Sequence, residues 1–176
     1  MNNLIISAVG SDRSGIVSEI SGIITSHGGN VEESRMSKMG SNFAIIMLVS
    51  VLPDWDESLK VALRSIADLN IITKFTEAHN ISDIKKFWIY LNGADNEGII
   101  NVLSEYLAGE SINIIELNTY ISPAPITGAP LFNLNAIIVL PQDIIIEKIH
   151  SDLETISQTL GVEIMLNESE SIIKSV

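Results

Sequence analysis

The sequence contains no cysteine, which excludes disulfide bonds, zinc–thiolate sites and cysteine nucleophiles. It has only three histidines, and none of them stands beside a candidate nucleophile or at a metal-ligand spacing. No run of 18 apolar residues occurs, so no segment is predicted to span a membrane. We therefore predict no catalytic residue, no metal ion and no cofactor, and a cytoplasmic location.

Basic residues are also scarce, because 10 Lys and Arg stand against 22 Asp and Glu, giving a net charge of −12. Nucleic-acid binding relies on Lys and Arg that neutralise phosphates. The charge therefore argues against DNA, RNA or an anionic membrane as a direct partner. With 176 residues, 46% of them hydrophobic, the chain is long enough for one large or two small well-packed domains.

The chain repeats itself. When it is shifted by 83 positions, residues 10–36 lie on residues 93–119 without a gap. The identical pairs are Gly10/Gly93, Asp12/Asp95, Gly15/Gly98, Ile16/Ile99, Ser21/Ser104, Asn30/Asn113 and Glu33/Glu116. After an insertion of about six residues, "FAIIMLVSV" from Phe43 lies on "FNLNAIIVL" from Phe132. A tandem duplication explains this pattern.

Hydrophobic periodicity predicts the same element order in both halves. Strands are expected over 4–9, 31–39, 43–51 and 71–75, then over 86–92, 112–121, 132–140 and 162–166, and helices over 15–27, from 53–56 onward, 97–109 and 143–160. This order is β-α-β-β-α-β twice, so the predicted fold class is α+β, with two ferredoxin-like units in tandem. We expect domains at 1–79 and 86–168, a linker at 80–85 and a C-terminal tail at 169–176.

Both faces of the strand that starts at Phe43 are apolar. A lone unit would therefore expose an apolar sheet face, which is typical of an association surface. We expect the halves to pack on each other, on a second chain, or both, with a homodimer as the oligomer.

A polar loop bounded by Gly10 and Gly15 precedes the first predicted helix. It lacks the Lys and Ser/Thr of a phosphate-binding P-loop, so nucleotide binding is not predicted. Asp12 and Asp95 are expected to cap the helices that follow them. For the glycines two readings stay open. Either they only shape a tight turn, or they leave helix N–H groups free to receive a carboxylate, with Asn30 binding an amino group.

The stretches "GSDRSGIVSEI" and "HGGNVEESRM" resemble the ACT domain, a small-molecule regulatory module. Together with "EESRMSKMGSNFAIIMLVS" and "SPAPITGAPLFNLNA", they make the chain similar to the glycine cleavage system transcriptional repressor family. The resemblance implies amino acids as ligands, bound at the strand-to-helix loop near an interface between ACT units. It also implies action through another regulatory protein.

Carried over by position, the resemblance gives two candidate ligand sites. The first comprises Gly10, Ser11, Asp12, Arg13, Ser14, Gly15, Ile16 and Asn30, and the second comprises Gly93, Asp95, Asn96, Gly98, Ile99 and Asn113. The family usually has proline at the place of Ser14, so this loop is expected to be more mobile. Glu97 replaces Ser14 in the second copy and would repel a ligand carboxylate, which predicts a weakened second site.

The sequence thus predicts a non-enzymatic regulator that senses an amino acid, with glycine as the candidate, and acts on a partner transcriptional regulator by protein contact. The alternatives are a detached regulatory subunit of an amino-acid metabolic enzyme, and an interaction module without a ligand. The insertion "ISPAPITGAPLF" has two open readings, a long hairpin loop or an arm that docks a partner. Its prolines are expected to prevent regular strand pairing.

Overall fold

The computed structural model describes residues 1–77 and 85–168. The chain divides into two compact units, Met1–Asn80 and Ile81–Val176. Apart from Lys85, the predicted linker at 80–85 lies outside the described residues, and so does the predicted tail at 169–176. None of the described helices is long and apolar enough to cross a membrane.

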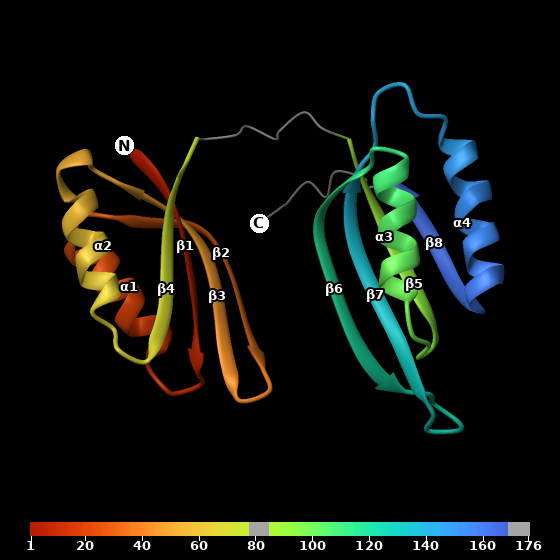
Figure 1. Cartoon of the computed structure of the whole chain (residues 1–176), viewed down its shortest axis with the longest axis horizontal. Helices are drawn as coiled ribbons and strands as arrows, with labels where there is room; N and C mark the ends of the chain where they lie inside the picture. The colour runs from red at the N-terminus through yellow and green to blue at the C-terminus, as the bar shows by residue number, and fades with distance from the viewer. Residues whose placement is uncertain (78–84, 169–176) are drawn as a thin grey trace, which may run out of the picture. The chain divides into compact units, whose positions relative to one another are not determined.

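The first unit is a four-stranded antiparallel sheet with two helices on one face (Figure 1). Its elements are β1 (Asn2–Ser11), α1 (Ile16–Ser26), β2 (Asn30–Met39), β3 (Asn42–Val51), the 3-10 turn η1 (Pro53–Trp55), α2 (Asp56–Arg64) and β4 (Leu69–Thr76). The strands lie in the order β2-β3-β1-β4.

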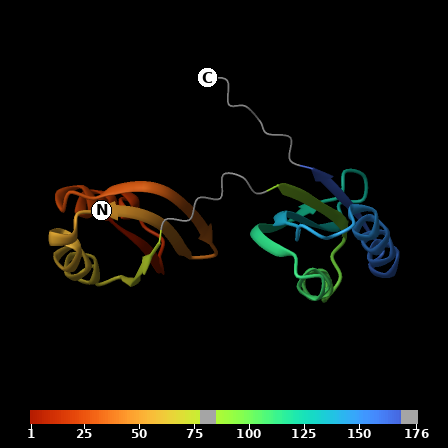
Figure 2. The ribbon, with the colours of Figure 1, turned by 90° about the horizontal axis from the view of Figure 1, so that it is seen from above.

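The second unit repeats this plan, again with both helices on one face of its sheet (Figure 2). Its elements are β5 (Lys86–Ala94), α3 (Ile99–Gly109), β6 (Asn113–Pro123), β7 (Pro130–Val139), α4 (Ile146–Leu160) and β8 (Val162–Glu168). The order β6-β7-β5-β8 corresponds strand for strand to the first sheet. The predicted fold class, two βαββαβ units, is confirmed.

The strand register confirms the duplication. Gly10 pairs with Phe43 in the first sheet, and Gly93 pairs with Phe132 in the second. Both sheets also have a bulge at the same place, between residues 31 and 33 and between residues 114 and 116. The alignment read from the sequence is therefore the structural one.

Each strand alternates between a face covered by the helices and an open face. In β1, Leu4, Ile6 and Ala8 are buried under α1 and α2, whereas Ile5 and Val9 lie on the other face. The open face of the first sheet is apolar at its centre, and Val9, Ile46 and Ile72 on it are 51%, 49% and 61% exposed. The predicted apolar sheet face is thus present in this unit.

Two boundary predictions are wrong. The last helix begins at Ile146 and not at residue 143, because the Ile144 N–H donates to the Pro141 carbonyl (3.3 Å) in a separate turn. The insertion forms more regular structure than expected, since β6 and β7 continue pairing up to Pro123 and Pro130. Proline is tolerated there because β6 is an edge strand and Pro130 is the first residue of β7.

Candidate functional site

A pocket of about 400 Å³ lies where β1 passes into α1. Its walls come from the loop, the first turn of α1 and the start of β3. The lining residues are Asp12, Arg13, Gly15, Ile16, Val17, Ser18 and Phe43. Four of the predicted ligand-site residues therefore meet in one place.

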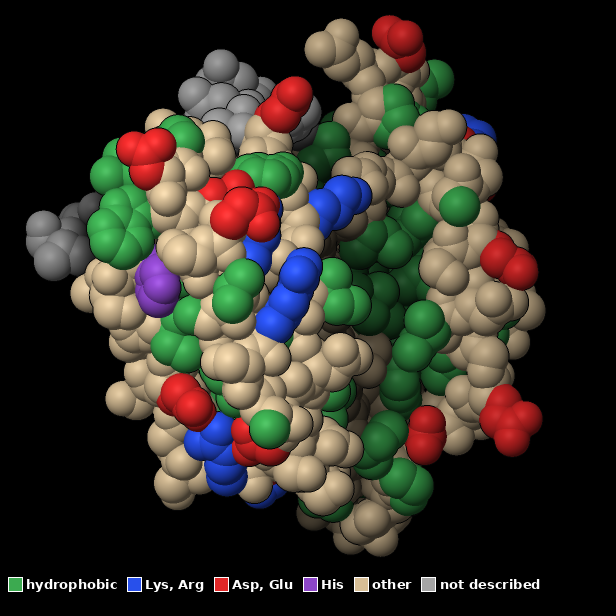
Figure 3. Space-filling model, turned by 60° about the vertical axis from the view of Figure 1, so that its left-hand side comes forward, with side chains coloured by type: hydrophobic (Ala, Val, Ile, Leu, Met, Phe, Trp, Pro, Cys, Tyr) green, Lys and Arg blue, Asp and Glu red, His purple; other side chains and the backbone are tan. Residues whose placement is uncertain are grey.

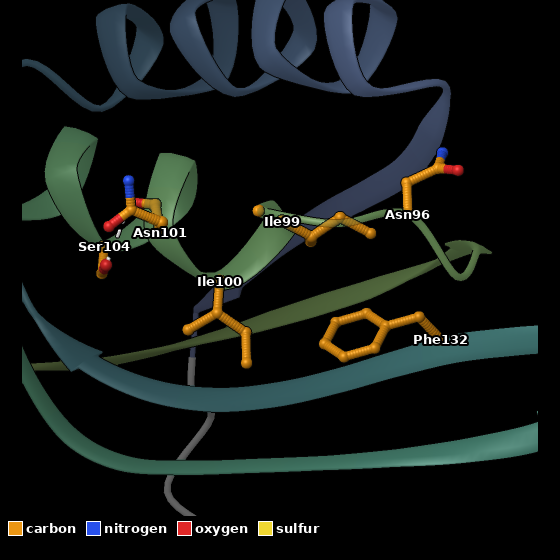
Figure 4. A pocket seen from close by; sticks show the side chains of 7 residues that line it. Asn96, Ile99, Ile100, Asn101, Ser104 and Phe132 are labelled. Carbon is orange, nitrogen blue, oxygen red and sulfur yellow. Dashed lines mark hydrogen bonds between the residues drawn. The ribbon is translucent and has the colours of Figure 1, made fainter.

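The second unit has a pocket of the same size at the same place. It is lined by Asn96, Gly98, Ile99, Ile100, Asn101, Ser104 and Phe132. In Figure 4 Ile100 from α3 and the ring of Phe132 from β7 border one space, and the Ser104 hydroxyl donates to the Asn101 carbonyl (3.1 Å). Six lining positions correspond across the repeat, although Asp95, which matches Asp12, does not line the second pocket. The fold therefore builds nearly the same pocket twice.

Gly15 and Gly98 stand at the N-cap positions of α1 and α3 with φ values of 91° and 85°. A left-handed backbone of this kind is strained for residues with a Cβ, which explains the glycine in both copies. A Cβ at either position would meet no atom within 4 Å. The space beside the helix terminus is therefore open.

The first turn of α1 offers backbone donors to this space, because the N–H groups of Ile16, Val17 and Ser18 have no acceptor within the helix. The prediction that Asp12 and Asp95 cap the helices is wrong, since neither α1 nor α3 has a side-chain capping hydrogen bond. Asp12 instead pairs with Lys38 (2.6 Å), and its N–H donates to the Ser41 carbonyl (2.9 Å). The chain turns again between Asp12 and α1, so the Asp12 carboxylate faces the β2–β3 hairpin.

Arg13 does not offer a free positive charge to the pocket. Its guanidinium donates to the carboxylates of Asp68, just before β4, and Glu19 in α1. The hydrogen bonds from Arg13 hold the pKa of Asp68 below its ordinary value. In the second unit Asn96 reaches the corresponding point, because its Nδ2 donates to the Leu160 carbonyl (3.4 Å) just before β8. Each side chain therefore joins the loop before the first helix of its unit to the segment just before the last strand, β4 or β8.

Gly10 and Gly93 serve the sheet and do not line the pockets. A Cβ on Gly10 would stand 2.2 Å from the Asp68 carbonyl oxygen, and one on Gly93 would stand 2.8 Å from the Val162 Cα. These glycines therefore let the last strand begin close against the first. Sequence reasoning left a purely structural reading open for them, and the contacts support it.

Asn30 and Asn113 lie away from the loops, which corrects the expectation that they join the same site within a unit. Asn30 pairs with Ser50, at the opposite end of the sheet from the Gly10–Phe43 pair. Its amide donates to Glu32 (3.1 Å). Asn113 correspondingly pairs with Val139.

The remaining predicted residues lie at the margins. Ser11 ends β1 opposite Asn42, and Ser14 and Glu97 do not line the pockets. Sequence reasoning missed Phe43 and Phe132 as lining residues, although their alignment in the repeat was a usable signal. Within the described residues, no group of three or more His, Asp or Glu could hold a metal ion.

Comparison with known proteins agrees with this fold. Residues 2–76 match the ACT domain family. The glycine cleavage system transcriptional repressors of Escherichia coli (strain K12) and Shigella flexneri are each 32% identical over 127 residues. The match spans 69% of this chain and 66% of each relative, just under two thirds of their length.

Two solved structures are similar to nearly the whole chain. An unknown protein from Galdieria sulphuraria is 32% identical, with a TM-score of 0.85 over 96% of this chain and 99% of that one. A structure provisionally named a glycine cleavage system transcriptional repressor has a TM-score of 0.67 at 22% identity, over 97% and 98% of the two chains, and so supports the fold. The two βαββαβ units and the family match together define a tandem ACT-domain protein. Within that class, the curated proteins that this chain resembles are the glycine cleavage system transcriptional repressors reported above.

Proposed function

We propose that this chain is a non-enzymatic regulator that binds an amino acid, with glycine as the candidate, in the pocket between β1, α1 and β3. The main support for this proposal is that the same pocket recurs at corresponding residues of both units. Free N–H groups at the positive end of the α1 dipole suit the ligand carboxylate. The relatives named as transcriptional repressors support a regulatory role.

The effect on transcription is proposed to pass through a partner regulator. Lys148, one of the few cations on the second unit's helices, is paired with Glu110 (2.5 Å) and Asp152 (3.2 Å). On the face drawn in Figure 3, Lys and Arg side chains lie among acidic ones and form no continuous stripe. Such a surface offers few counterion-releasing contacts to phosphates. Exposed Ile46 and Ile72 support the proposal of a homodimer.

A thermal-shift screen of the chain against the twenty amino acids tests the ligand. A ligand at about 100 times its Kd stabilises the folded state by about 2.7 kcal/mol, which raises the melting temperature by several degrees. Ser18→Glu then separates binding from folding. A carboxylate in the first helical turn is stabilised by the helix dipole, so the variant should remain folded. The same carboxylate repels a ligand carboxylate, so the variant should lose the ligand-induced rise in melting temperature.

The matched variant Asn101→Glu places the same charge in the second pocket. If only Ser18→Glu removes the shift, the first pocket is the sensor. If no amino acid stabilises the wild-type chain, the sensing proposal is wrong.

A mobility-shift assay with the candidate promoter tests the mode of action. We expect no specific shift by the chain alone and a ligand-dependent change once the partner regulator is added. A specific, salt-sensitive shift by the chain alone would disprove action through a partner. Capture of a metabolic enzyme in place of a regulator would favour the alternative, a detached regulatory subunit.

A further inference from the structure

The open face of the second sheet holds a polar pocket of about 210 Å³, separate from the loop pockets. All four strands contribute to it. The lining residues are Tyr90, Leu91, Asn92, Tyr120, Asn133, Asn135, Glu163 and Met165. The register explains the grouping, because Asn92 lies opposite both Asn133 and Glu163, while Tyr120 lies opposite Asn133.

The corresponding positions of the first unit carry no such group. Tyr90 and Asn92 correspond to Ser7 and Val9 of β1, and Asn133 and Asn135 to Ala44 and Ile46 of β3. Asparagine is disfavoured in strands, yet three asparagines lie on the two central strands of this sheet. Residues that oppose local propensity in only one of two copies point to a function of that copy.

Hydrogen bonding leaves the pocket rich in acceptors. The Asn92 amide donates to Asn133 Oδ1 (2.7 Å), and the Asn133 amide donates to Ser122 Oγ (2.9 Å). Among the described residues, Glu163 has no ion-pair partner and the Asn135 side chain has no hydrogen bond. No Lys or Arg lines the pocket. The unpaired carboxylate and amide oxygens therefore favour a cationic donor.

We propose that this pocket binds the primary ammonium group of a small amine. An ammonium has three donors, which suit the Glu163 carboxylate and the amide oxygens of Asn92 and Asn135. The rings of Tyr90 and Tyr120 add aromatic surface that attracts cations. The volume is below that of a drug-sized site, so the amine has few heavy atoms.

The structure supplies a reporter for this site. Trp88 stacks on Tyr90, with ring centroids 6.0 Å apart and an interplanar angle of 10°. The chain has two tryptophans, so Trp55→Phe leaves Trp88 as the sole tryptophan signal. Ethylamine hydrochloride, titrated into this variant against sodium chloride of equal ionic strength, should give a saturable fluorescence change.

Glu163→Gln keeps the shape of the side chain and removes its charge. We expect it to weaken ethylamine binding by about tenfold or more, as for loss of a charge-assisted hydrogen bond, with an unchanged melting temperature. The control Glu154→Gln removes an exposed charge from α4 and should leave the affinity unchanged. Ser18→Glu, which tests the loop pocket, should also have no effect here.

Absence of a saturable signal would overturn the proposal, and so would equal affinity in Glu163→Gln. Nα-acetyl-lysinamide distinguishes the sources of the ammonium. Tighter binding of this compound than of ethylamine would assign the pocket to a lysine side chain of a protein, and weaker binding would assign it to a free amine. Either result supports ammonium recognition.

Discussion

Asp68 accepts hydrogen bonds from both Nε and Nη2 of Arg13, so the entrance of β4 is joined directly to the loop before α1. The two residues are 55 positions apart, and Gly10 brings their segments together by admitting the Asp68 carbonyl against β1. The loop that borders the first pocket is therefore held by the last strand of its own sheet.

This pair predicts a specific pH dependence. The pKa of Asp68 is lowered in the folded state, so the pair stabilises the fold above the unfolded pKa of about 3.9 and loses its effect as the pH falls through the folded value. Asp68→Asn should lower stability near neutral pH, and the difference from wild type should vanish in acid. Urea unfolding across this range measures it. Asp143→Asn is the control, and an equal loss at every pH would contradict the assignment.

The close approach at Gly10 and Gly93 predicts a large loss of stability on substitution. Gly10→Ala and Gly93→Ala each place a Cβ against backbone, which should cost about 1–3 kcal/mol of unfolding free energy. Gly22→Ala is the matched control inside α1, where a Cβ meets nothing within 4 Å. It should stabilise the chain by about 0.5–1 kcal/mol. The midpoints of urea unfolding measure these changes in stability. A Gly10→Ala variant as stable as the wild type would refute the packing explanation.

The left-handed conformation of Gly15 predicts a graded response to side chains. Gly15→Ala should lower the unfolding free energy by about 1–2 kcal/mol. Gly15→Asn should cost less, because asparagine tolerates this conformation better. Thermal melts of both variants, with the Gly98 pair as a parallel series, measure the difference. Equal losses for Ala and Asn would show that space, and not φ, limits the position.

The β6–β7 hairpin tip predicts a separation of stability from partner binding. Ile126 is 97% exposed, and the tip is held by local bonds such as that from the Ala124 N–H to the Ala129 carbonyl (2.8 Å). Ile126→Ser should therefore change stability by less than about 0.5 kcal/mol. We expect it to reduce capture of the proposed partner regulator. Unchanged capture would assign the hairpin to a simple connection.

The fold could be predicted from the sequence because both copies have the same hydrophobic periodicity. Aligning the two copies gave two independent observations of each helix and strand. The ion pair between Lys38 and Asp12, which leaves Asp12 without a capping role, was not predictable from the sequence. The two residues come together only because the sheet places the β2–β3 hairpin beside the loop that follows β1. Asn30 was misplaced because the length of α1 separates it from the loop it was expected to join. The open-face pocket was missed because its members come from four strands and share no local motif.

The alternation of covered and open faces along each strand has an evolutionary consequence. Every second residue is constrained by the core, so the intervening positions can change with little effect on folding. After a gene duplication, one copy can then acquire a new surface chemistry while both copies keep the same scaffold. The asparagine–tyrosine face of the second unit and the isoleucine-rich face of the first record such a divergence.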